Sequence, residues 1–104
     1  LPLPSLTLGA VGTVDAPLSI IPSVYNELYN AWISGDIETA NEKQNEVTRK
    51  VSVLKSYNPA ADASKILLTE ILDVDCGRSI LPNRRLTDIE IKELLSRAKE
   101  AELI

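Results

Sequence analysis

The sequence of 104 residues contains no histidine, no methionine and no phenylalanine, and it has one cysteine, Cys76. One cysteine cannot form a disulfide within the chain, and without histidine the chain lacks the side chain most often used as a general base. The pattern contains neither a glycine-rich phosphate loop nor a cluster of metal ligands, so we expect no cofactor and no metal. Because no initiator methionine is present and the chain begins abruptly with Leu-Pro-Leu-Pro, we expect it to be a fragment.

Positive charge and long apolar runs are also scarce. Eleven basic and fifteen acidic residues give a formal net charge of −4, which argues against binding to a phosphate backbone. No apolar run reaches the roughly 18 residues of a membrane helix, and no charged segment precedes an apolar one as in a signal peptide. We therefore expect no nucleic-acid or membrane partner. The single cysteine, Cys76, favours a reducing, cytoplasmic location.

Most of the chain shows the three-and-four spacing of apolar residues that is typical of amphipathic helices. This spacing predicts helices near residues 21–34, 36–57, 59–73 and 87–102. Gly35 is placed to end the first helix in a left-handed conformation, and Asp36 to cap the second. Thr87 and Glu90 have the spacing of a capping box.

Several polar residues outside the helix ends have specific predictions. Gln44 falls within the apolar seam of the second helix, and we predict that it bonds a backbone group where helices cross. Asn58 and Pro59 are predicted to start the third helix. Lys65 is predicted to be a surface or interface residue. Arginines 78, 84 and 85 lie in a loop and would suit an anion, but pairing with carboxylates is more common and is our prediction.

The stretch Gly9–Pro22 organises the rest of the chain. Glycines 9 and 12 flank apolar Ala10, Val11 and Val14, which is typical of a short buried strand, and Pro22 suits the first turn of a following helix. The stretch therefore predicts strand, turn and helix. The two prolines at positions 2 and 4 disfavour a long helix before it, so an irregular lead-in is expected.

The order of residues in Gly9–Pro22 resembles the last barrel strand of the dihydrodipicolinate synthase / N-acetylneuraminate lyase family. That family reads Gly-Ala-x-Gly-x-Ile-Ser, three residues, Asn, two residues, Pro; here Asp15 replaces the Ser and Ser19 replaces the Asn. The resemblance continues to the C-terminus through Gly35-Asp36, Ala40, Gln44 and Leu81–Thr87. In the last of these marks, Arg85 replaces the second proline of the family's Pro-Leu-x-Pro-Leu-Thr run.

The resemblance implies a fold and a function. A whole (β/α)8 barrel needs about 250 residues, so the chain would be mainly α: the last strand and the C-terminal helical cap, with about four helices. Residues 1–19 would be the lead-in and strand, and residues 20–104 the helical region. Family members are class I lyases and aldolases that bind pyruvate or another 2-oxo acid as a lysine imine, with a tyrosine as proton shuttle.

In that family the imine lysine and the tyrosine lie on earlier strands, so the resemblance implies no catalytic residue in this chain. Gly12, Thr13 and Val14 would form one wall of the substrate site, since Val14 matches an isoleucine whose carbonyl faces the imine. The chain alone would be inactive. The alternative function is a free-standing helical protein–protein interaction module. A strand without neighbours either packs as an arm or pairs with a second copy, and we expect a homo-oligomer.

Overall fold

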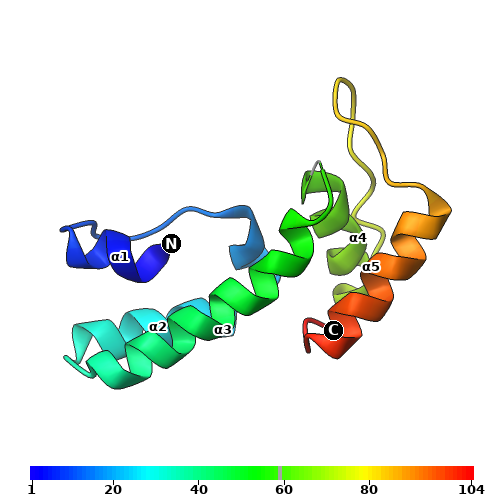
Figure 1. Cartoon of the computed structure of the whole chain (residues 1–104). Coiled ribbons are helices and arrows are strands. Elements are labelled where there is room, and N and C mark those ends of the chain that lie inside the picture. The colour runs from blue at the N-terminus through cyan, green and yellow to red at the C-terminus, as the bar shows by residue number, and fades with distance from the viewer. Residues whose placement is uncertain (59) are drawn as a thin grey trace. The chain divides into compact units, whose positions relative to one another are not determined.

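The structure is a computed structural model that describes residues 1–58 and 60–104. Within these residues, five α-helices and a 3-10 helix follow each other (Figure 1): α1 (Pro2–Thr7), η1 (Ala16–Ser19), α2 (Pro22–Ile33), α3 (Ile37–Lys55), α4 (Ala60–Leu72) and α5 (Asp88–Glu100). No strand occurs among these residues. The chain divides into two compact units, residues 1–49 and 50–104, with the boundary inside α3.

The four predicted helices are confirmed as α2 to α5, with each described end within two residues of its prediction. The predicted caps are confirmed as well. Gly35 has a φ of +81°, and its N–H donates to Trp32 O while the N–H of Asp36 donates to Ala31 O, which together form a Schellman motif. The predicted role of Pro59 at the start of α4 lies outside the described residues. None of the described helices is long and apolar enough to cross a membrane.

In the first unit, α1 contacts α2, and α3 is joined to both of them. The backbone N–H of Leu3 in α1 donates to Gln44 Oε1 in α3 at 2.9 Å, which confirms the predicted backbone partner of Gln44. Lys43 in α3 pairs with Glu27 in α2. The buried apolar side chains of this unit are those of Leu3, Leu6, Ile20, Ile21, Val24, Tyr25, Leu28, Ala31, Ala40 and Val47.

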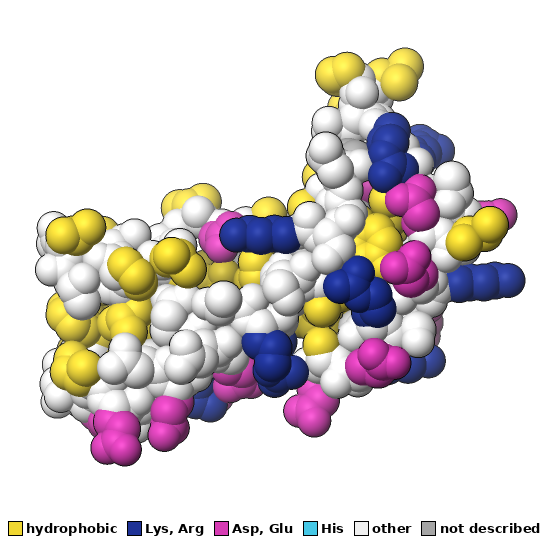
Figure 2. Space-filling view, viewed as in Figure 1, with side chains coloured by type: hydrophobic (Ala, Val, Ile, Leu, Met, Phe, Trp, Pro, Cys, Tyr) yellow, Lys and Arg dark blue, Asp and Glu magenta, His cyan; other side chains and the backbone are white. Residues whose placement is uncertain are grey.

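The broad apolar stripe of α2 is only partly covered. Tyr29 and Ile33 are 40% and 65% exposed, and Ile37 at the start of α3 is 47% exposed. Figure 2 shows apolar side chains at the surface over α1 and α2. The described part of the chain therefore leaves this apolar face exposed to solvent.

Two predictions for the N-terminal segment are wrong. An irregular lead-in was expected, but Pro2–Thr7 forms helix α1. Pro2 and Pro4 fall in its first turn, where no N–H needs a partner, and burial of Leu3 and Leu6 stabilises it.

A strand was expected at Gly9–Asp15, but none forms. A strand needs a neighbour to share its hydrogen bonds, and none of the described residues supplies one. The segment instead turns back on α1: Gly9 has a φ of +101°, and the N–H of Ala10 donates to Ser5 O.

In the second unit, α4 packs against α5. The capping box of α5 is confirmed, because Thr87 Oγ1 accepts from the Glu90 N–H and Glu90 Oε1 accepts from the Thr87 N–H. Arg97 in α5 donates to Ser56 Oγ, and its guanidinium carbon lies 5.6 Å from the ring centroid of Tyr57. The buried apolar side chains of this unit are those of Val51, Val53, Leu54, Tyr57, Ala63, Ile66, Leu67, Leu86, Leu94, Ala98 and Leu103.

Candidate functional site

Gly12, Thr13 and Val14, the predicted wall of the substrate site, lie together in the extended segment between α1 and η1. All three are exposed, and Val14 is 103% exposed, so its side chain has no covering neighbour. Within the described residues, no backbone N–H or C=O of residues 11–14 takes part in a hydrogen bond. The segment is therefore available to pair with, or to cover, another surface.

The next residue, Asp15, is tied to the helical part of the unit. Tyr25 Oη in α2 donates to Asp15 Oδ2 at 2.8 Å. Tyr25 is 5% exposed, and this burial, together with the hydrogen bond to Asp15, raises its pKa well above the usual value. The hydroxyl therefore stays protonated and remains a hydrogen-bond donor to the carboxylate.

Two lysines, Lys43 and Lys65, are held by oxygen acceptors, whereas an imine-forming lysine must lose its proton to attack a carbonyl. Lys43 is paired with Glu27 and Glu46, and these carboxylates raise its pKa, the opposite of what such chemistry needs. Lys65 Nζ donates to the carbonyl of Arg78. No group of three or more residues suited to hold a metal ion occurs within residues 1–58 and 60–104.

Asp62, in the first turn of α4, accepts four hydrogen bonds. Its side chain is 0% exposed and pairs with Arg78: Arg78 Nε donates to Oδ1 at 2.9 Å and Arg78 Nη2 to Oδ2 at 2.7 Å. The backbone N–H groups of Ser79 and Leu86 donate to the same carboxylate at 2.9 and 2.7 Å. Hydrogen bonds from Arg78, followed by those from the two amides, lower the pKa of Asp62 well below its ordinary range.

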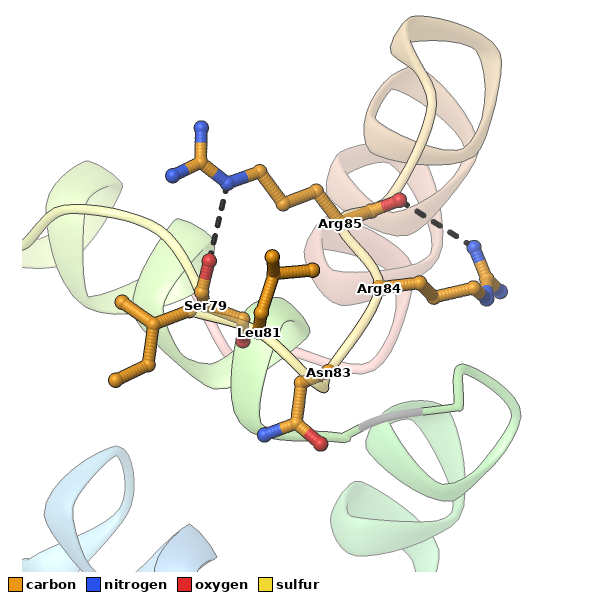
Figure 3. Close-up of a pocket in the computed structure, with 6 residues that line it drawn as sticks. Ser79, Leu81, Asn83, Arg84 and Arg85 are labelled. Carbon is orange, nitrogen blue, oxygen red and sulfur yellow. Dashed lines mark hydrogen bonds between the residues drawn. The ribbon is translucent and has the colours of Figure 1, made fainter.

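Asp62 therefore clamps both ends of the loop that carries the three arginines. The predicted pairing is confirmed for Arg78 and also for Arg84, which is bidentate to Glu90 at 2.9 Å for each bond. Arg85 differs, because its Nε donates to the carbonyl of Ser79. In Figure 3 the side chains of Arg84 and Arg85 point away from each other across the loop, so the cations do not converge on one anion.

The same loop encloses an open hollow of about 700 Å³ that is lined by residues 79–81 and 83–85. Ile80 and Leu81 at its tip are 75% and 89% exposed. Its lining residues include no nucleophile placed beside a base, so the hollow has no sign of a catalytic site. It belongs to a surface loop whose shape is fixed by the hydrogen bonds to Asp62.

Comparison with known proteins gives this arrangement a context. No protein-family model matches the chain. The chain is 28% identical over all 104 residues to a 4-hydroxy-tetrahydrodipicolinate synthase from Archaeoglobus fulgidus, and the match covers 35% of that protein. A synthase of the same name from Methanopyrus kandleri is 43% identical over 42 residues, or 40% of this chain and 14% of that protein.

Among solved structures, Proteus mirabilis N-acetylneuraminate lyase matches with a TM-score of 0.81 and 25% identity, over 98% of this chain and 34% of the lyase. The chain is homologous to these synthases and to the lyase. It spans about a third of the length of the A. fulgidus synthase and of the lyase. The family resemblance predicted from the sequence is thereby confirmed.

Within this homologue of the synthases and the lyase, two side-chain contacts were not predicted from the sequence: those of Asp62 and of Asp15. Asp62 was not singled out, although an acidic residue in the first turn of a helix is a common stabilising feature; its partners lie 16 to 24 residues away. Asp15 is a departure from the family pattern, but the sequence indicates no partner for it; the structure shows that this partner is Tyr25. No local pattern identifies either pair.

Proposed function

We propose that this chain is the C-terminal third of a pyruvate-dependent, Schiff-base-forming lyase or synthase. In this proposal residues 1–19 are the lead-in and last barrel strand, and residues 20–104 are the helical cap. The chain is inactive alone, and the catalytic lysine and tyrosine belong to the preceding part of the barrel. The observation that carries the proposal is the match over the whole chain to one third of the synthase and of the lyase.

The state of the segment Gly9–Asp15 supports this proposal. Two of its valines, Val11 and Val14, are 91% and 103% exposed, and the backbone groups between them have no hydrogen-bond partner in the described part of the chain. Apolar, β-branched residues are typical of buried strands and not of solvated loops. The barrel would supply the neighbouring strands, and Gly12, Thr13 and Val14 would then border the bound 2-oxo acid.

A complementation experiment tests the proposal. The 104-residue chain is co-expressed with the preceding part of the A. fulgidus synthase, and each piece is also expressed alone. Each sample is incubated with pyruvate, reduced with borohydride and analysed by intact-protein mass spectrometry. We expect an adduct only in the co-expressed pair, on a lysine of the synthase piece.

Two results would reject the proposal. A stoichiometric adduct on any of the six lysines of the chain alone would show that it carries its own imine chemistry. Failure of the two pieces to co-purify, with the chain monomeric in light scattering, would show that its open apolar segment needs no barrel. Co-purification with an unrelated helical protein, without an adduct, would favour the alternative function as an interaction module.

A further inference from the structure

One side-chain hydrogen bond fixes the end of the segment Gly9–Asp15 to α2. The donor is Tyr25, whose ring is buried in the core of the first unit at 5% exposure, so the position of its hydroxyl is set by packing. The acceptor is Asp15 Oδ2, 2.8 Å away. The bond therefore joins a rigid donor on a helix to an acceptor on a segment that has few other restraints.

The restraints on either side of residues 11–14 are local. The N–H of Ala10 donates to Ser5 O at 3.0 Å, and the N–H of Leu18 donates to Asp15 O at 3.1 Å. Within residues 1–58 and 60–104, the bond from Tyr25 is the only one that links a side chain of Gly9–Asp15 to α2. Without this bond, no contact with α2 would fix the side-chain orientation of Asp15 or the orientation of the residues before it.

The extended backbone at Asp15 determines which side chains the bond from Tyr25 can orient. Asp15 has φ −151° and ψ 140°, an extended conformation in which consecutive side chains point to opposite faces. Since the side chain of Asp15 points to α2, the side chain of Val14 points away from α2, in agreement with its full exposure. A shift of one residue would exchange the two faces of the segment.

We propose that Tyr25 is a positioning residue that fixes, through Asp15, the register and the facing of Gly12–Val14. The serine that the homologous family places at position 15 has an oxygen one atom closer to the backbone, so its reach toward the Tyr25 hydroxyl is shorter. The consequence of the Tyr25–Asp15 pairing for catalysis rests on the function proposed above, whereas the tether itself does not.

The tether is tested on the 104-residue chain by ¹⁵N relaxation. Tyr25→Phe removes only the hydroxyl, and Tyr29→Phe is the matched control, because it makes the same change one turn later on a 40% exposed tyrosine. In Tyr25→Phe and Asp15→Ala, we expect the order parameters of the amides of Gly12–Asp15 to fall below about 0.6, the range of flexible backbone. Tyr29→Phe and Asp15→Asn, which keeps an acceptor oxygen, should leave them unchanged.

Unchanged order parameters in a folded Tyr25→Phe chain would overturn the inference, as would an equal fall in Tyr29→Phe. The co-expressed enzyme then separates this inference from the proposed function. There, Tyr25→Phe and Asp15→Ala should each raise the KM for pyruvate several-fold, whereas Asp15→Asn, which keeps an acceptor oxygen for the Tyr25 hydroxyl, should leave it unchanged. If the unaltered pair forms no adduct, the proposed function fails, but the relaxation measurement still tests whether Tyr25 holds Asp15. If the order parameters of Gly12–Asp15 fall in Tyr25→Phe while the KM is unchanged, the positioning role is refuted.

Discussion

The carboxylate of Asp62 is the residue whose removal should most change the stability of the second unit. Asp62→Ala deletes the acceptor of four hydrogen bonds, two from Arg78 and one each from the N–H groups of Ser79 and Leu86. Leaving a buried donor without a partner costs about 1–3 kcal/mol. Arg78 has a side chain that is 30% exposed, so its guanidinium can turn toward water and adds less.

The expected loss is therefore about 3 kcal/mol, the lower end of the range for breaking a buried ion pair. Urea denaturation of the wild type and of Asp62→Ala measures it. Asp75→Ala is the matched control: Asp75 is exposed and accepts one backbone bond, from Gly77 at 2.8 Å, so its loss should be below about 1 kcal/mol. Hydrogen exchange should show loss of protection at the amides of Ser79 and Leu86.

A loss below about 1 kcal/mol for Asp62→Ala, or equal losses for the two variants, would refute the reasoning. The first result would mean that the loop 78–86 keeps its shape without the carboxylate. The second would mean that burial of Asp62 adds nothing to its hydrogen bonds, contrary to the physical basis of the estimate.

Three further outcomes are expected. Because the pKa of Asp62 is lowered on folding from about 3.9 in an unfolded chain, its contribution should be complete above about pH 5 and be lost as the pH falls below about 4, so acid titration of stability should be shallower in Asp62→Ala. Gly35→Ala should cost about 1 kcal/mol in urea denaturation because of the left-handed backbone at φ +81°, whereas Gly12→Ala, which meets open space, should change stability by less than about 0.5 kcal/mol. Thr87→Ala removes the cap of α5 and should cost about 1 kcal/mol by the same assay. An unchanged thermal midpoint would show that the capping box does not form in solution.

The helical part of the fold could be predicted from the sequence because its determinants are local. The glycine at 35, the aspartate at 36 and the Thr87–Glu90 pair act on backbone groups within a few residues of themselves. Such signals do not depend on how distant segments pack. The prediction for Gln44 succeeded for a related reason, since a polar residue inside an apolar seam must find a partner wherever the helices meet.

The failures concern interactions between distant residues. Asp62 and Leu86 are separated by 24 residues, and any of the chain's acidic residues could have paired with Arg78 on sequence grounds alone. The strand at Gly9–Asp15 failed because its residue types describe an environment and not a conformation. Alternating small and β-branched residues suit the interior of a sheet, but the hydrogen bonds of a sheet come from other segments.

Two sets of exposed apolar residues now have different meanings. Ile80 and Leu81 are 75% and 89% exposed, yet the loop that carries them is closed at both ends by the carboxylate of Asp62. Val11 and Val14 are exposed to a similar degree, but the backbone between them is unbonded in the described chain. Exposed apolar side chains alone are common on protein surfaces. An apolar stretch whose backbone also lacks hydrogen-bond partners is different: burying it without partners costs free energy, and its N–H and C=O groups can pair with another strand. Within the described residues, the unbonded backbone of residues 11–14 is thus well suited to pair with another strand, and the function proposed above assigns that strand to the preceding part of the barrel.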